Sequence, residues 1–334
     1  MPGRRSTRKR DLLAIGAAVI FLLAAVYAGA RWLETRSANP EPRGDHTLRY
    51  ADEQITVNGA AYRLRQNLTT ILLMGIDQES GQNQTGNFRS GGQADFLRLV
   101  VVDPAEKAIS QIQIDRDAMT PVPVLDVLGS RSGRQTMQIC LSHGFGDGKE
   151  QSCLLTAEAV SDYLLHMPVD HYAAMNLDGI SVLNDALGGV TVTLEDDFSS
   201  LDPAMTQGTT LTLRGKQAEY FVRSRREIGD GSNEVRMRRQ QAYISQLTDL
   251  LLEKVQSDER FIGELFDLLA PYLITDVSRA EWINDAWAWR NYSRRPLSIP
   301  EGTHTIGESG FMEFRADEKS LQQIVLNLFC KEIK

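Results

Sequence analysis

The chain has 334 residues, of which 42% are hydrophobic and 24% charged, and its formal net charge is −8. This length and composition fit a folded protein of one large domain or two modest ones. The acidic balance argues against general nucleic-acid binding, which requires a basic surface, so we expect no nucleic-acid partner.

The N-terminus carries the clearest signal of organisation. Residues 1–11 are rich in Arg and Lys, and the 19 residues 12–30 that follow carry no charge. A helix of that length spans a hydrocarbon core of ~30 Å. Because basic flanks stay cytoplasmic, we predict a basic tail (1–11), a transmembrane anchor (12–30) and an extracytoplasmic remainder at the cell membrane. The alternative is a cleaved signal peptide ending at Ala28-Gly-Ala30, although its apolar region is usually only ~7–15 residues long.

Beyond the anchor, the pattern predicts a polar stalk (31–67) with room for one short strand, a main domain (68–255) and a helical C-terminal extension (256–334) packed on that domain. Short apolar runs and turn residues predict the strands 71–75, 96–102, 108–114, 171–177 and 190–194. Helical spacing predicts helices at 154–167, 178–187 capped by Asp178, 215–222, 234–252, 261–269, 279–287 and from 320 onward, with a strand-like stretch between the last two. Strands that alternate with helices indicate an α/β fold, here a layered α-β-α domain with a central mixed sheet.

The three cysteines, Cys140, Cys153 and Cys330, match no metal-binding spacing. In an extracytoplasmic domain Cys140 and Cys153 could form a disulfide, and two unrelated buried thiols are equally consistent with the sequence.

A segment with six arginines and no lysine lies at residues 223–239, which we call the arginine segment. Three acidic residues offset the arginines, so the segment has a net charge of +3. If the chain is extended there, Arg223 and Arg225 point to one face, and Arg236, Arg239 and Gln240 share a face of the next helix. Two rows of forked donors fit a diphosphate. The alternative is a solvated stripe paired with Glu227 and Glu234.

Two aspartates lie at predicted strand ends, where ligands of α/β sheets bind. Asp77 follows the first strand, and Asp95 opens the second. Two carboxylates beside a phosphate suit Mg²⁺, which keeps several waters. Arg116 and Asp117 close the third strand at the edge expected to face the same cleft. Either aspartate is equally explained as a turn residue, and Arg116–Asp117 as a surface ion pair.

Six motifs in order resemble the LytR-CpsA-Psr family of cell-envelope glycopolymer phosphotransferases. They are Ile71-Leu-Leu-Met-Gly-Ile-Asp77, Ala94-Asp-Phe-Leu-Arg-Leu-Val-Val-Val-Asp-Pro104, Ile114-Asp-Arg-Asp117, Leu183-Asn-Asp-Ala-Leu-Gly-Gly-Val190, Phe221-Val-Arg-Ser-Arg225 and Arg236-Met-Arg-Arg-Gln-Gln241.

The resemblance implies an enzyme that moves a glycopolymer phosphate from a polyprenyl-pyrophosphate carrier to peptidoglycan or another wall acceptor, with Mg²⁺ as cofactor. It implies that Asp77 and Asp95 hold Mg²⁺ and that pyrophosphate binds to Arg116, Arg223, Arg225, Arg236, Arg239 and Gln240. It also implies an apolar tunnel for the lipid, which the sequence does not locate. Phosphoryl transfer depends mainly on charge neutralisation and positioning, which these residue types provide.

The chain departs from the family pattern at two positions. Asp115 stands where the family usually has proline, beside Arg116. Asn233 stands where the family commonly has an aspartate, a candidate general base, and an amide cannot accept a proton at neutral pH. Asp230, in the turn, is then a candidate for that role, unless the base lies elsewhere.

Two other functions compete with phosphotransfer. A phosphatase would hydrolyse polyprenyl pyrophosphate with water as the acceptor. A non-catalytic sensor of anionic wall polymer would need the arginines but not the carboxylates. The sequence names neither the glycopolymer nor the acceptor, nor the oligomeric state.

Overall fold

The computed structural model describes residues 55–57, 60–79, 91–126, 128–224, 228–229 and 231–333. The predicted basic tail and anchor lie outside these residues, as do Arg225 and Asp230. Among the described residues, no helix is both long and apolar enough to cross a membrane. The chain divides into two compact units, which we treat separately.

A six-stranded sheet lies at the centre of the second unit, whose described part falls within Ala24–Ala174, Ile274–Glu281 and Arg294–Lys334. Its strand order is β11 (Leu273–Thr275), β8 (His171–Asn176), β3 (Thr69–Ile76), β4 (Ala94–Asp103), β5 (Ala108–Ile114) and β12 (Ser293–Arg294). The pairs β3–β4 and β4–β5 are antiparallel, whereas the bridge between Ile112 of β5 and Ser298 is parallel. The fold is α/β with a central mixed sheet, as predicted.

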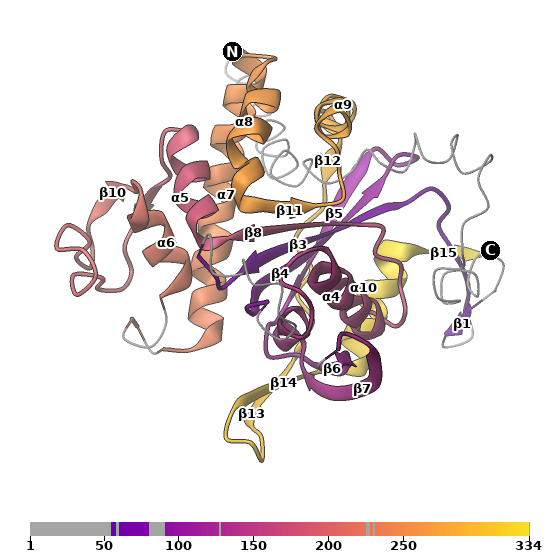
Figure 1. Ribbon diagram of the computed structural model, residues 1–334. Helices are drawn as coiled ribbons and strands as arrows, with labels where there is room; N and C mark the ends of the chain where they lie inside the picture. The colour runs from indigo at the N-terminus through magenta and orange to yellow at the C-terminus, as the bar shows by residue number, and fades with distance from the viewer. Residues whose placement is uncertain are drawn as a thin grey trace, which may run out of the picture. The chain divides into compact units, whose positions relative to one another are not determined.

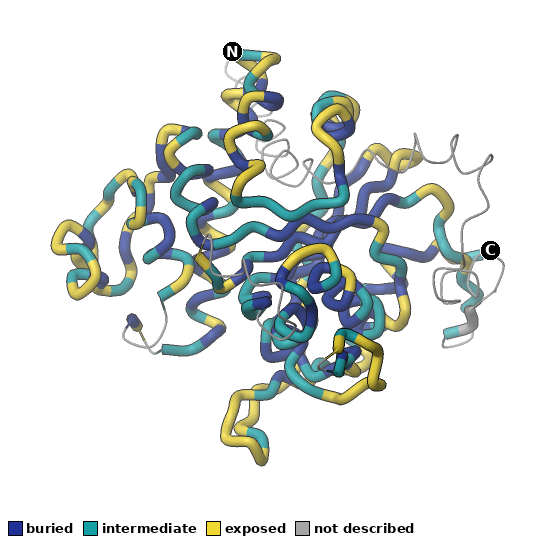
Figure 2. The backbone as a smooth tube through the Cα atoms, viewed as in Figure 1, coloured by how far each residue is buried: buried dark blue, intermediate teal, exposed yellow. Residues whose placement is uncertain are grey.

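The middle of this sheet is buried on both faces. Every residue of β5 is buried, and β3 is buried except at Gly75 (Figure 2). One face packs against α4 (Glu150–Tyr163) and α10 (Glu318–Phe329) (Figure 1). These helices supply Val160 and Val325 to the core. Short strand-like runs bounded by turn residues located β3 to β5 well, although β4 and β5 also bury polar residues such as Arg98 and Gln113.

Smaller sheets surround this core. They are the three-stranded sheet of β1 (Ile55–Val57), β2 (Ala60–Leu64) and β15 (Cys330–Ile333), and the hairpins β6 (Met119–Leu125) with β7 (Arg131–Gln138) and β13 (Gly302–Ile306) with β14 (Met312–Ala316). Since β2 pairs with β15, the end of the predicted stalk belongs to the folded unit. In the C-terminal extension, β12, β13 and β14 lie where the sequence predicts a strand-like stretch, and β11 and β15 are further strands beside the helices.

Helices dominate the first unit, whose described part comprises Met175–Leu273 and Trp282–Ser293. They are α5 (Leu177–Ala186), α6 (Lys216–Arg223), α7 (Asn233–Ser257), α8 (Phe261–Leu269) and the second half of α9 (Arg279–Trp289), with a small hairpin of β9 (Thr191–Thr193) and β10 (Thr210–Thr212). The predicted bounds of α8 are confirmed.

Several predicted helix boundaries differ from the structure; α7, for example, ends at Ser257 and not at 252. The cap of α5 is Asn176, whose side chain accepts a hydrogen bond from the Gly179 amide at 3.1 Å, and not Asp178. Asn and Asp cap helices about equally well, so position decides: Asn176 has the extended backbone of a cap, whereas Asp178 already lies in the first turn. Helix α4 begins at Glu150. It ends at Tyr163 because Leu165 and His166, just beyond it, adopt the left-handed conformation with φ of 57° and 66°.

Candidate active site

A β-bulge places the two aspartates at one end of the central sheet. Gly75 pairs with Phe96 and Ile76 with Ala94, so Asp95 is the extra residue between two paired positions. The amides of Asp77 and Asp95 both donate to the Gln93 carbonyl oxygen, at 2.9 and 3.1 Å. Bulges re-aim side chains and recur next to active sites. The predicted proximity of Asp77 and Asp95 is therefore supported at the backbone.

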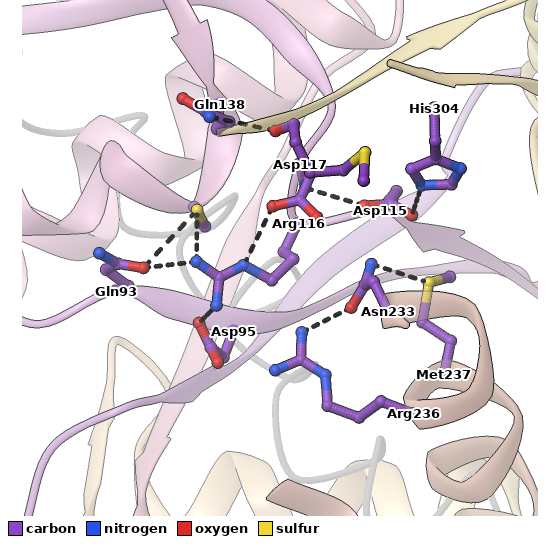
Figure 3. A network of polar contacts seen from close by, with 12 residues as sticks. Gln93, Asp95, Asp115, Arg116, Asp117, Gln138, Asn233, Arg236, Met237 and His304 are labelled. Carbon is purple, nitrogen blue, oxygen red and sulfur yellow. Dashed lines mark hydrogen bonds and ion pairs between the residues drawn. The ribbon is translucent and has the colours of Figure 1, made fainter. Parts of the chain in front are cut away.

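Arg116 joins this site from the turn that follows β5 (Figure 3). Its guanidinium forms a close ion pair with Asp95 and a hydrogen bond to the Gln93 side-chain oxygen. It also donates to the Cys140 sulfur at 3.3 Å, and its Nε lies 3.4 Å from the Asp117 carboxylate. We call Asp77, Gln93, Asp95 and Arg116 the carboxylate cluster. The sequence predicts three of these four residues but not Gln93, which no motif distinguishes.

Burial and charge set the protonation of this cluster. Burial acts to lower the pKa of Arg116, but Cys140, Asp95 and Asp117 together raise it above its ordinary value. Burial also raises the pKa of the Cys140 thiol to about 12, so this sulfur is uncharged at neutral pH. At neutral pH Arg116 is therefore a fixed cation that faces carboxylates.

The thiols do not form the disulfide that the sequence left open. Cys140, Cys153 and Cys330 are all free and buried. Cys140 contacts Arg116, whereas the Cys153 sulfur lies 4.0 Å from the His143 ring. Burial raises the pKa of Cys153 and lowers that of His143, so both groups are neutral and do not form a thiolate–imidazolium pair.

The donor set of the carboxylate cluster fits a hard cation that binds few protein ligands. Asp77 is exposed, and the Asp95 side chain is 19% exposed. Across the described residues, no group of three or more acidic, histidine or cysteine side chains could hold a metal. Mg²⁺ commonly binds one or two carboxylates and completes its shell with water and phosphate oxygens. Asp77 and Asp95 could hold Mg²⁺ in that way, together with a phosphorylated substrate.

In the first unit, Arg223 is the last residue of α6, so its backbone is helical. Its side chain is 46% exposed, and Nη1 lies 3.3 Å from the Glu219 carboxylate one turn earlier. The backbone becomes extended only at Ser224. Arg223 therefore does not meet the condition of an extended chain under which Arg223 and Arg225 would point to one face.

Arg236 is buried near the start of α7, where its side chain contacts Asn233, the position at which the family commonly has an aspartate (Figure 3). Its Nη2 donates to the Asn233 side-chain oxygen at 2.6 Å. Asn233 follows the helix cap Ser232, whose hydroxyl accepts from the Val235 amide at 3.2 Å. The amide thus keeps the hydrogen bond that an aspartate would accept, but it cannot act as a base.

Arg239 and Gln240 hold the end of α6. Arg239 donates to the Ser224 carbonyl oxygen and lies 5.0 Å from the centre of the Phe198 ring. Gln240 donates to the Val222 carbonyl oxygen at 3.1 Å. The last carbonyls of a helix have no partner within it, so these bonds supply what α6 lacks. The arginine segment is therefore divided in role, since Arg238 on the same helix is 64% exposed and lies 3.9 Å from Glu234.

Fold and site together define an α/β protein with a charged cluster at the strand ends of its central sheet. Residues 38–327 match the LytR_cpsA_psr family, and this match covers most of the chain. The protein belongs to that family, as its motifs indicated.

Curated relatives share this family resemblance at low identity. The chain is 26% identical over 342 residues to the polyisoprenyl-teichoic acid–peptidoglycan teichoic acid transferase TagU of Bacillus subtilis, covering 98% of both chains. TagU of Halalkalibacterium halodurans is 26% identical over 223 residues, which cover 67% of this chain and 66% of that relative.

Solved structures support the fold. Protein gbs0355 from Streptococcus agalactiae aligns with a TM-score of 0.63 at 20% identity, covering 78% of this chain and 86% of that one. TagT bound to LI-WTA aligns with a TM-score of 0.59 at 22% identity, covering 79% and 90%.

Proposed function

We propose that the protein is a Mg²⁺-dependent phosphotransferase that moves a glycopolymer phosphate from a polyprenyl-pyrophosphate carrier to peptidoglycan or another cell-wall acceptor. Family membership and the TagU relatives, which are named as teichoic acid transferases, support transfer of a wall glycopolymer. The observation that carries the proposal is the carboxylate cluster, where Arg116 binds Asp95 beside Asp77.

The chemistry requires neutralisation of a pyrophosphate while one of its P–O bonds is replaced. The acceptor hydroxyl oxygen forms a new bond to the phosphorus next to the sugar, polyprenyl phosphate leaves, and the hydroxyl proton is lost. Asp77 and Asp95 would hold Mg²⁺, which when bound supplies positive charge to the phosphate oxygens. Arg116 would bind the same oxygens with its rigid fork of donors, and Arg223, Arg225 and Arg236 would add further positive charge.

We also propose that the enzyme is tethered to the cell membrane by residues 12–30, with its folded part outside. A polyprenyl carrier stays in the bilayer, so a tether raises the effective concentration of enzyme and substrate. Nothing in this function requires a nucleic acid.

The test is transfer by the full-length chain in detergent micelles. The donor is a polyprenyl-pyrophosphate-linked disaccharide phosphate, the acceptor is a peptidoglycan fragment, and the products are polyprenyl phosphate and the modified acceptor. We expect turnover with MgCl₂, loss with EDTA and loss in Asp95→Asn. Glu106→Gln, an exposed acid in the turn after the same strand, is the matched control.

Three outcomes would contradict the proposal in different ways. Wild-type turnover in Asp95→Asn would exclude the carboxylate cluster from the chemistry. Release of polyprenyl phosphate that does not depend on the acceptor would instead identify a phosphatase. Binding of the donor without turnover, retained in Asp95→Asn, would indicate a sensor of anionic polymer.

A further inference from the structure

The β13–β14 hairpin is docked on the turn that carries Arg116. The Phe314 amide donates to the Asp117 carbonyl oxygen at 2.8 Å, and Phe314 forms a parallel bridge with Ala118. The Gln138 side chain adds a hydrogen bond to the Met312 carbonyl at 3.1 Å. Most of the hairpin is exposed (Figure 2). Its strand β14 is nevertheless fixed through Phe314 to Asp117 and Ala118.

Asp115 organises that turn with both oxygens of its side chain. Oδ1 accepts from the Asp117 amide at 2.8 Å, and the Asp115 carbonyl accepts from the Ala118 amide at 3.0 Å. Oδ2 lies 3.0 Å from Nε2 of His304 on β13 (Figure 3). The Asp115 side chain is only 5% exposed, so each of these donors matters: a buried carboxylate that loses a donor is costly.

His304 is itself held in place. It pairs across the hairpin with Phe314, and the centres of the two rings lie 4.8 Å apart. Its imidazole thus reaches Asp115 from β13, whose partner strand β14 is bonded to Asp117 through the Phe314 amide. The residue after Asp115 is Arg116, whose carbonyl accepts from the Cys140 amide at 3.1 Å.

We propose that His304 is a positioning residue for Arg116: through Asp115 it fixes the turn 115–118 so that the guanidinium keeps its orientation toward Asp95 and the substrate pyrophosphate. This inference rests on the proposed function only for the identity of the ligand. Asp115 stands where the family usually has proline, whose ring fixes the backbone angle φ. In this chain, hydrogen bonds to the Asp115 side chain, including the one from His304, fix the turn instead.

The first measurement needs no ligand. Hydrogen–deuterium exchange of the full-length chain is followed in peptides that span residues 114–119, for wild type, His304→Ala and His304→Gln. We expect faster exchange in His304→Ala and near wild-type exchange in His304→Gln, whose amide can donate to Asp115. Thr305→Ala, an exposed neighbour on the same strand, is the control. Unchanged exchange in His304→Ala would overturn the proposal even if the proposed function failed.

The second measurement links the turn to Arg116. Binding of inorganic pyrophosphate with MgCl₂ is measured by calorimetry in a cycle of His304→Ala and Arg116→Ala. We expect His304→Ala to weaken binding about five- to tenfold in the wild-type background and to have no further effect without Arg116. Equal losses in both backgrounds would show a merely structural role. Absence of binding by wild type would contradict the proposed function and leave the exchange result to decide this inference.

A third variant tests whether proline at position 115 can fix the turn 115–118 without the hydrogen bond from His304. In Asp115→Pro the turn is fixed by the ring, so adding His304→Ala should leave pyrophosphate affinity unchanged. If His304→Ala still weakens binding several-fold in the Asp115→Pro background, His304 acts by another route and the proposal is wrong.

Discussion

The carboxylate cluster and the arginine segment differ in what holds their charged groups. In the cluster, the backbone amides of Asp77 and Asp95 donate to the same carbonyl oxygen, that of Gln93, and the Arg116 side chain forms an ion pair with Asp95. In the arginine segment, Arg223 is half-exposed, whereas Arg236 and Arg239 are buried and donate to oxygens of their own unit. An arginine-rich sequence therefore does not form one uniform anion-binding site, because its arginines differ in burial and in hydrogen-bond partners.

The largest effect should come from the carboxylates. We expect Asp77→Asn to lower kcat by roughly 10²–10³-fold, because Asp77 would hold the Mg²⁺ that stabilises developing negative charge, and loss of one such stabilising group has effects of that size. A titration of activity with MgCl₂ would show whether high Mg²⁺ rescues part of the loss. If Asp77→Asn keeps both turnover and Mg²⁺ affinity, the metal does not bind at this end of the sheet.

Arg116→Lys should have the next largest effect. Lysine keeps the charge but lacks the planar fork that meets Asp95 and Gln93 together, so we expect pyrophosphate binding to weaken roughly ten- to a hundredfold. Cys140→Ser is the matched control, because it changes one neutral contact of Arg116 and keeps the guanidinium. Equal affinity for Arg116→Lys and wild type would show that only the charge of Arg116 matters.

Two arginines of the same segment allow a sharp comparison of exposure with function. Arg223→Ala should raise KM for the donor about tenfold or more, because a partly exposed guanidinium is available to a phosphate. Arg238→Ala, which removes an exposed ion pair, should change KM less than twofold. Similar KM values for the two variants would support the solvated stripe that the sequence left open.

Arg239→Ala should reduce stability more than substrate affinity. It removes the donor to the Ser224 carbonyl at the end of α6 and leaves a buried site, so we expect a loss of ~1–3 kcal/mol in free energy of unfolding. Urea denaturation, compared with Arg238→Ala, would measure it. A large rise in KM without loss of stability would instead return Arg239 to the pyrophosphate-binding set.

Glu219→Gln should give the smallest effect on stability, and the size of that effect depends on pH. Burial raises the pKa of Glu219 in the folded protein. The folded state therefore favours the protonated carboxyl, so stability from this group is complete below the unfolded pKa and is lost as pH rises through the folded one. We expect Glu219→Gln to be more stable relative to wild type at pH 7 than at pH 4, by less than about 1 kcal/mol. A gap in Tm that does not change with pH would contradict this.

The sequence by itself determined the class of fold, the three central strands and most of the candidate site. Short strand-like runs bounded by turn residues identified β3, β4 and β5, which lie in the middle of the sheet. Their ends marked Asp77, Asp95 and Arg116, and the order of the motifs identified the family that residues 38–327 match.

Only the tertiary structure decided which residues meet. No sequence motif marks the bulge at Asp95 or the hydrogen bond between Gln93 and Arg116. The same holds for the hydrogen bonds that Arg239 and Gln240 donate to carbonyls at the end of α6. Asp115 and His304 lie 189 positions apart, and no local pattern links them. Local periodicity determines elements and their buried faces, but hydrogen bonds between distant polar residues depend on how the chain packs.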